Sequence, residues 1–282
     1  MYGTMGPRFR GDDSSVIRPR MTRDQRPTPI VQPPAAQDEP WADLRRFTAA
    51  RIALPRSGAS LATAPLLEFR LAHARARDAV HAPFDAARLC TELAPLGLPV
   101  LTVASAARDR QQYLMRPDLG RRLADDAAAL LAARAGSGYD VAFVIADGLS
   151  ARAVAAHAQP LLADVLPRLA DLRIAPLVVA RLGRVALGDA VANALGAEIA
   201  VMLIGERPGL SAPDSMGAYL TFGPTPNTTD AERNCISNIR PAGLPYADAA
   251  LKLVHLIRAM RARRLSGVAL KDDADRLLIE QR

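Results

Sequence analysis

Three glycine-containing turns carry the side chains best placed to touch a ligand. They are residues 147–148 (DG), 183–185 (GRV) and 205–209 (GERPG), and each follows a continuous apolar run. If these runs are strands of a parallel sheet, all three turns lie at its carboxyl edge. Open α/β sheets bind ligands there, because helix N-termini and unpaired backbone N–H groups converge at that edge. The positions predict one shared ligand-binding rim.

The turn at 205–209 has the most specific chemistry of the three. Its two glycines let the backbone fold tightly and approach a flat ligand closely. Between them, the carboxylate of Glu206 is able to accept hydrogen bonds from ligand amides. The alternative is a simple tight turn with a surface pair between Glu206 and Arg207, which contributes little to stability. The residue pattern alone leaves both interpretations open.

Residues 229–239 (TDAERNCISNI) combine a helix signal with a cysteine. Thr229 and Glu232 have the spacing of a capping box, which predicts a short helix. A nucleophilic Cys235 needs a histidine partner, and none is nearby in the sequence. We therefore expect Cys235 to pack as a small, soft side chain. The four histidines are scattered, at His73, His81, His157 and His255.

The chain lacks the common signatures of autonomous catalysis. It has no GxxxxGK[ST], GxGxxG, HExxH or GxSxG motif, and no carboxylates clustered at metal-ligand spacing. Cys90 and Cys235 have no CxxC spacing, which argues against a zinc site and against a disulfide-built scaffold. We predict no catalytic residue and no metal ligand in this chain. A binding or subunit role follows.

The elements that must position these turns predict a Rossmann-like α/β fold. Apolar runs at 141–146, 174–180 and 198–204 alternate with helical segments at 150–158 and 188–195. Such runs are typical of a parallel sheet covered on both faces, so we predict a largely parallel sheet flanked by helices. Further expected elements are a strand at 98–103 and helices at 65–80, 118–135 and 246–264.

The domain organisation follows from composition. Residues 1–46 are rich in proline and arginine and poor in large apolar residues, which predicts a disordered N-terminal tail. One α/β domain is expected over residues 47–266, with a helical part at 47–135 and a sheet-containing part at 136–266. Residues 267–282 are expected to form a C-terminal tail. Whether Met21 is the true start stays open.

The predicted helix at 65–80 is two-sided. One side is an apolar face of Leu67, Leu71 and Ala74. The other is a basic stripe of Arg70, His73 and Arg77, at positions i, i+3 and i+7. Such a stripe either faces solvent or docks on an acidic partner surface or a phosphate. The sequence leaves both alternatives open.

Charge and hydropathy exclude several partners. The net charge is +7, but basic residues are spread along the chain and no aromatic-plus-basic stripe marks a nucleic-acid surface. We therefore expect no nucleic-acid partner. No apolar run reaches the ~18 residues that span a bilayer, and the N-terminus lacks a secretory core. These features predict a cytoplasmic, reduced protein with no membrane partner.

Nearly all of residues 47–266 resembles the light, or small, subunit of ethanolamine ammonia-lyase. The last two of the matching stretches are long, contain unusual tripeptides and come in the family's order. The matching stretches are ARIALPRSGASL (50–61), LAHARARDAVH (71–81), YLMRPDLGRRL (113–123), VIADGLSA (144–151), GRVALGD (183–189), IGERPGLSAPDSMGAYL (204–220) and ERNCISNIRPAG (232–243).

The resemblance implies an adenosylcobalamin-dependent complex that converts ethanolamine to acetaldehyde and ammonia by a radical mechanism. A large TIM-barrel subunit would bind the substrate, this subunit would close the cobalamin site, and neither would be active alone. The complex would be a higher-order hetero-oligomer. The cofactor would stay base-on, with cobalt held by the corrin, which agrees with the absence of an Asp-x-His-x-x-Gly motif. The family's cobalamin contacts match Val185, Glu206 and Cys235.

The chain departs from the family pattern at both ends. In some relatives the N-terminal segment directs the enzyme into a bacterial microcompartment, but the segment here is too polar to predict that. Two rival functions remain at this point. One is a stand-alone nucleotide- or corrinoid-binding module, and the other, suggested by charge alone, is a nucleic-acid-associated protein.

Overall fold

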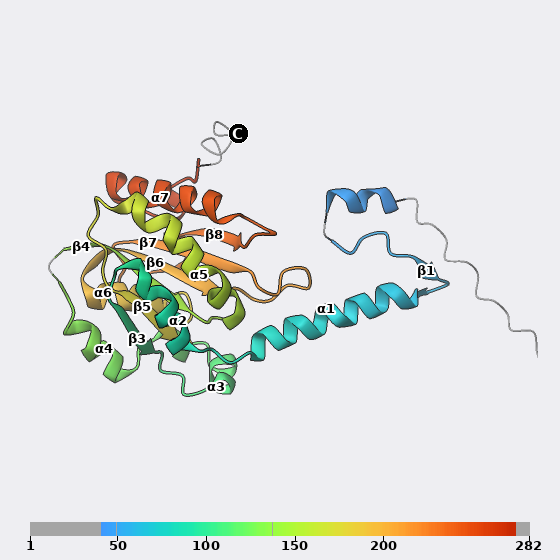
Figure 1. The fold of residues 1–282 in the computed structure, drawn as a ribbon, viewed down its shortest axis with the longest axis horizontal. Coiled ribbons are helices and arrows are strands. Elements are labelled where there is room, and N and C mark those ends of the chain that lie inside the picture. Colours follow the sequence, from blue (N-terminus) through green and yellow to red (C-terminus); the bar gives the residue numbers. More distant parts are fainter. Residues whose placement is uncertain (1–40, 49, 137, 275–282) are drawn as a thin grey trace, which may run out of the picture.

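A computed structural model of the chain describes residues 41–48, 50–136 and 138–274 (Figure 1). The strands are β1 (Arg56–Ser57), β2 (Ser60–Leu61), β3 (Val100–Ala104), β4 (Tyr139–Ala146), β5 (Leu177–Arg181), β6 (Ala197–Gly205), β7 (Met216–Phe222) and β8 (Arg233–Ile239). The α-helices are α1 (Thr63–His81), α2 (Ala86–Leu93), α3 (Arg110–Met115), α4 (Asp125–Ala132), α5 (Ala151–Val165), α6 (Leu187–Leu195) and α7 (Tyr246–Arg263). Short 3-10 helices occupy Ala42–Phe47, Ala94–Leu96, Leu119–Arg121, Leu166–Leu169, Asp230–Glu232 and Gly267–Ala269.

The described strands form a six-stranded sheet in the order β3-β5-β4-β6-β7-β8, with β1 and β2 in a separate hairpin. The first four strands of this order run parallel, and β7 and β8 are antiparallel additions at one edge. The prediction of an α/β fold with a largely parallel sheet is therefore confirmed. The predicted strand at 174–180 begins only at Leu177, because Pro176 before it has no N–H to donate to a ladder.

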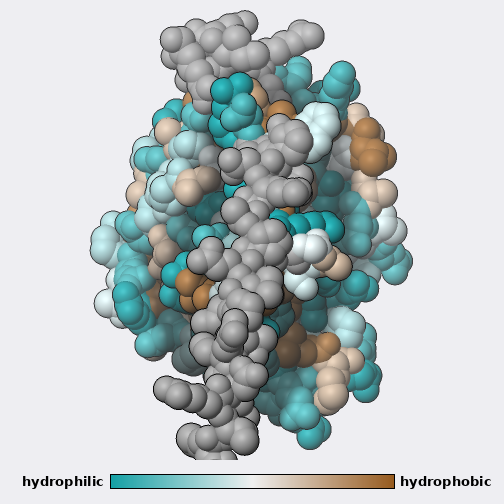
Figure 2. Space-filling view, turned by 90° about the vertical axis from the view of Figure 1, so that its right-hand side faces the viewer, coloured by the Kyte–Doolittle hydropathy of each residue, from teal (hydrophilic) through white to brown (hydrophobic). Residues whose placement is uncertain are grey.

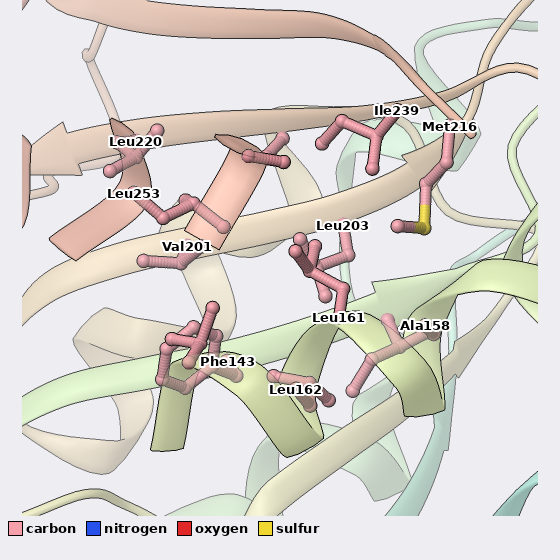
Figure 3. Packing of buried hydrophobic residues seen from close by; sticks show 14 of the residues in the cluster. Phe143, Ala158, Leu161, Leu162, Val201, Leu203, Met216, Leu220, Ile239 and Leu253 are labelled. Atoms are coloured by element: carbon pink, nitrogen blue, oxygen red, sulfur yellow. The ribbon is translucent and has the colours of Figure 1, made fainter. Parts of the chain in front are cut away.

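One face of the sheet, called here the closed face, is covered by α2, α5 and α7 (Figure 1). Its core is made of fully buried apolar side chains from strands and helices alike. Figure 3 shows Phe143 of β4, Val201 and Leu203 of β6 and Leu220 of β7 packed near Leu161 and Leu162 of α5 and Leu253 of α7. Helix α7 buries its apolar side, at Leu253, Leu256, Ile257 and Met260.

The opposite face, called here the open face, is covered only in part. Helices α4 and α6 pack over β3, β5, β4 and β6 with a second buried cluster that includes Val144, Val178 and Met202. Among the described residues of strands β7 and β8, Tyr219 of β7 is the only apolar side chain that packs against this cluster, and it is partly buried. The part of the open face around Tyr219 stays accessible, and Cys235 on β8 is exposed. Farther along the face, Arg233 of β8 pairs with Asp189 of α6, and both are buried.

Helix α1 confirms the helix predicted at 65–80, but its apolar face is not part of the core. Leu67 and Leu71 are 56% and 52% exposed. Figure 1 shows why, since most of α1 projects away from the body. The helix is tied to the body at its C-terminal end, where Arg110 Nε donates to the carbonyl oxygen of Val80 at 2.9 Å.

Two predicted elements differ from the structure. The helix expected at 118–135 is broken, because Leu123 forms a β-bridge with Ser105 and α4 begins only at Asp125. The capping box at Thr229 is confirmed, with its backbone N–H donating to Glu232 Oε2 at 2.7 Å. The predicted short helix is a single 3-10 turn, Asp230–Glu232, and strand β8 follows directly at Arg233.

Most of the predicted N-terminal tail and half of the predicted C-terminal tail lie outside the described residues. Residues 1–40 of the predicted disordered tail and residues 275–282 of the C-terminal tail are not described. The 3-10 helix Ala42–Phe47 falls at the end of the former and Gly267–Ala269 within the latter. Among the described residues, no helix is long and apolar enough to cross a membrane.

Candidate functional site

The three turns selected from the sequence lie together at the carboxyl ends of β4, β5 and β6. The Leu149 N–H donates to the carbonyl oxygen of Gly205 at 2.8 Å, and the Gly183 N–H donates to Asp147 Oδ1 at 3.4 Å. Gly148 has a φ of +54°, and a Cβ there would overlap the Gly205 carbonyl oxygen. The predicted rim is therefore one connected structure, and it depends on glycine at this close approach.

Asp147 is the buried charge at the centre of the rim, with only 3% of its surface exposed. Burial raises its pKa to about 6, while the Arg110 guanidinium, 3.4 Å away, and the N–H groups of Leu182 and Gly183 act in the opposite direction. Because Arg110 also donates to the Gly148 carbonyl oxygen at 2.6 Å, it joins α3 to the rim. No sequence pattern pointed to Arg110.

Val185 lies on a turn that an aromatic stack fixes. The fully buried Tyr113 donates its hydroxyl to the carbonyl oxygen of Gly183 at 3.2 Å. The Arg184 guanidinium lies 4.2 Å from the centre of the same ring and donates to the Tyr113 carbonyl oxygen. Burial raises the pKa of Tyr113 to about 12, so its hydroxyl remains a donor. Val185 is half-buried against the cluster beneath the open face.

Glu206 directs its carboxylate over β7. Its backbone N–H donates to the Ser215 carbonyl oxygen at 2.9 Å, and its Oε1 accepts from the Tyr219 hydroxyl at 2.8 Å. A Cβ at Gly217 would overlap that same Oε1, so Gly217 provides the space in which the carboxylate lies. The polar partner of Glu206 is therefore Tyr219, in contrast to the surface pair with Arg207 that the sequence left open.

Cys235 lies directly across from Tyr219 in the β7–β8 ladder, so both side chains point to the open face. The residue is exposed, yet burial of its thiol is enough to raise the pKa, and the nearby Glu206 charge adds to the effect. A raised pKa keeps the sulfur as a neutral thiol near pH 7, which is unfavourable for a nucleophile. Burial and the hydrogen bond to Glu206 also raise the pKa of Tyr219.

The structure thus brings the three sequence-selected residues to one face. Glu206 and Cys235 flank Tyr219, while Val185 and Tyr219 pack against the same buried cluster. Sequence reasoning missed Tyr219, which donates to Glu206 and lies across from Cys235. The available signal was the alternation along residues 216–222, where Met216, Ala218 and Leu220 point to the closed face.

The loop between β6 and β7, which carries Glu206 at its start, is held at its far end. Ser150 Oγ donates to the Pro213 carbonyl oxygen at 3.0 Å, and Asp214 lies 3.5 Å from an Arg240 nitrogen. Asp214 also lies 3.6 Å from Nε2 of the buried His157. Burial lowers the pKa of His157, so this contact involves a neutral imidazole near pH 7. Both ends of the loop are therefore fixed to the body.

The chemistry available here is that of binding. The described residues contain no group of three or more histidine, cysteine or acidic side chains that could hold a metal ion. Cys235 has Tyr219 and Glu206 as its electrostatic neighbours, and neither is a base suited to activate it near pH 7. The Glu206 carboxylate lies beside Tyr219, with Cys235 across from it in the ladder. A carboxylate next to apolar side chains suits a largely apolar ligand that carries amide donors.

Comparison with known proteins decides the family. Residues 38–271 match the family model described as "Ethanolamine ammonia-lyase light chain (EutC)". The chain belongs to this family.

Relatives of this light chain are similar to it over most of their length. The chain is 57% identical over 234 residues to the ethanolamine ammonia-lyase small subunit of Rhodopseudomonas palustris, covering 82% of this chain and 90% of the relative. It is 56% identical over 245 residues to that of Azotobacter vinelandii, with 85% and 91% covered. The small subunit of Ralstonia nicotianae is 52% identical over 263 residues, with 92% and 95% covered. The description of a light chain, or small subunit, implies a larger partner subunit.

Proposed function

We propose that this light chain forms one wall of an adenosylcobalamin site in a complex that converts ethanolamine to acetaldehyde and ammonia by a radical mechanism. The large, TIM-barrel subunit binds the substrate and completes the site, and the two subunits assemble into a higher-order hetero-oligomer. The observation that carries the proposal is the uncovered part of the open face. There Glu206, Tyr219 and Cys235 lie together beside the rim of a chain that belongs to the light-chain family.

The residues present fit a corrin, which is a broad and mostly apolar disc edged with amides. Val185 and Cys235 offer small apolar contacts, and the Glu206 carboxylate is an acceptor for amide N–H groups. Gly217 has no side chain, which leaves the space on β7 that the Glu206 carboxylate occupies. Val185, Glu206 and Cys235 would hold the cofactor. No residue of this chain is proposed as a ligand to cobalt, since the corrin would hold the metal.

When bound, the cofactor supplies the radical chemistry. This chain's contribution is to orient the cofactor and to enclose it. Tyr219 donates to Glu206 Oε1 and leaves the other carboxylate oxygen for a ligand amide, which fixes the direction from which the ligand is held. The wall also excludes water, since a radical on the substrate must survive until it rearranges.

Co-expression with the large subunit tests the function. We expect a co-purifying complex that deaminates ethanolamine only when adenosylcobalamin is added, and no activity from either subunit alone. The measurement is acetaldehyde release coupled to a dehydrogenase. An active, monodisperse light chain, or a complex that turns over without cobalamin, would overturn the proposal.

The substitution Glu206→Ala tests the site itself. Because hydrogen bonds to a charged group contribute about 1.5–3 kcal/mol, we expect cyanocobalamin to bind the assembled complex roughly 10- to 100-fold more weakly. Equilibrium dialysis measures the affinity. The matched control is Glu198→Ala, at the opposite end of β6 from Glu206, where the carboxylate pairs with Arg261. Equal affinities for the two variants would remove Glu206 from the site.

A further inference from the structure

Residues 41–48 and 50–81, called here the arm, expose an unusual amount of apolar surface. In the described part of the chain, twelve large hydrophobic residues are more than a third exposed, and seven of them lie in the arm. The seven are Trp41, Leu44, Phe47, Leu61, Leu67, Phe69 and Leu71. Single exposed apolar residues are ordinary on a protein surface, but this concentration in one projecting segment indicates an interaction surface.

The exposed residues of α1 occupy two sides of the helix. Leu67 and Leu71 are four residues apart and share one face. Phe69 lies between them in sequence, about 200° around the helix axis from Leu67 at 3.6 residues per turn, and is itself 39% exposed. A helix that merely rests on its own domain needs one apolar face. Apolar residues on both sides suit a helix that a partner holds in a groove.

The arm leaves the body at the rim. One Arg110 guanidinium donates both to the Val80 carbonyl oxygen at the base of α1 and to the Gly148 carbonyl oxygen on the rim. In Figure 1 the arm and the β6–β7 loop extend to the same side of the body. Figure 2 views that side directly, and separate hydrophobic patches stand out on a hydrophilic surface. Because the arm starts beside the rim, a partner that covers the rim would also lie next to the arm.

The arm is also strongly basic. Between residues 41 and 81 the sequence has seven arginines against three acidic residues, a net charge of +4 out of +7 for the whole chain. The stripe of Arg70, His73 and Arg77 is exposed along α1. Charge of one sign on a contact surface favours a partner of opposite sign and steers its approach.

From these four observations we infer that the arm docks on the large subunit, in an acidic groove with an apolar floor next to the face that closes the rim. This inference rests on the proposed function for the identity of the partner. With 19 residues, α1 reaches roughly 28 Å at 1.5 Å per residue, so the arm extends the contact well beyond the cobalamin wall.

The test is a titration of purified large subunit with the full-length light chain. The double substitution Leu67→Ser with Leu71→Ser should raise the Kd at least 30-fold, since contacts at the core of an interface dominate its affinity. Both side chains are largely exposed, so the melting temperature of the light chain should stay unchanged. The matched control is Leu130→Ser with Val268→Ser, at exposed apolar positions on the body, with less than a threefold effect. The substitutions Arg70→Glu and Arg77→Glu should also raise the Kd, and the increase should be larger at low salt than at high salt.

The outcomes separate this inference from the proposed function. If the wild-type complex forms and turns over while the arm variants bind with unchanged Kd, arm docking is wrong and the function stands. If the arm variants change only self-association of the light chain, the occupant is a second copy and the inference is equally wrong. If wild-type chains neither pair nor deaminate ethanolamine, the proposed function itself fails.

Discussion

The closed and open faces of the sheet are built from alternate residues of the same strands, yet they have different tasks. Over the closed face, α5 and α7 bury most of the apolar side chains that β6 and β7 send to that side. On the open face, α6 reaches β8 through the buried pair of Asp189 and Arg233, but Tyr219 is only partly buried and Cys235 is exposed. The difference teaches that one residue along the strand separates the core from the proposed cobalamin site. Substitutions on the closed face should therefore change stability, and those on the open face should change affinity for cobalamin.

The largest expected effect is on the closed face. Phe143→Ala removes a fully buried ring between β4 and α5 and should lower the free energy of unfolding by about 3–5 kcal/mol. Urea denaturation followed by circular dichroism measures it. A loss below about 1 kcal/mol would mean that this face tolerates cavities and is not the main source of stability.

A smaller effect is expected at the edge where the faces meet. Burial raises the pKa of Asp147 to about 6, above roughly 3.9 for an unfolded chain, so the folded state holds the proton more tightly. Ionisation between about pH 4 and pH 6 therefore lowers the free energy of unfolding, by up to about 3 kcal/mol. Asp147→Asn removes this loss while keeping an acceptor for the Gly183 N–H.

The stability of Asp147→Asn relative to wild type should therefore rise with pH across that window and level off above it. Denaturation at pH 4.5 and at pH 7.5 checks the sign. A relative stability that falls with pH would show that the Arg110 contact outweighs the burial of the carboxylate.

On the open face the effects should appear in affinity. Tyr219→Phe keeps the ring on its cluster and removes the hydroxyl that holds Glu206. We expect cobalamin to bind about 5- to 10-fold more weakly, which corresponds to one hydrogen bond of about 1 kcal/mol, with little change in melting temperature. Tyr139→Phe is the control, because Tyr139 packs on the same cluster at the amino end of β4. An equal loss in both variants would indicate a packing effect.

The smallest effect is expected at Cys235. Cys235→Ala removes one soft contact from an exposed position, so cofactor affinity should change less than about threefold and turnover should persist. Steady-state kinetics of the assembled complex measure both quantities. Complete loss of turnover with normal assembly would give the thiol a chemical role that the site geometry does not support.

The parts of the fold that the sequence predicts well are those in which burial leaves no ambiguity. The runs that form β4 and β6 are apolar on both faces, so the sequence alone places the turns after them at one edge of the sheet. β7 was missed, because Gly217 and Tyr219 interrupt its apolar residues. β8 was interpreted through its cysteine, whereas the buried Ile236 and Ile239 decide its conformation.

The candidate site divides in the same way. Val185 and Glu206 followed from position at the rim and agree with the resemblance, while Cys235 came from the resemblance alone. Tyr219 and Arg110 had no local signal, because their importance depends on what they contact: Glu206 in one case, Asp147 and the base of α1 in the other. The apolar face of α1 looked like core, since a periodic pattern does not distinguish the domain's own interior from a partner's surface.

The anchored β6–β7 loop bears on how tightly the proposed cobalamin wall would hold its ligand. Because Ser150 and Arg240 fix the end opposite Glu206, little backbone freedom is left to lose when a ligand arrives. Ordering a loose loop costs about 1–2 kcal/mol per residue in conformational entropy, and here that cost falls during folding of the subunit. The wall is preorganised, so most of the interaction energy of Glu206 remains available as affinity.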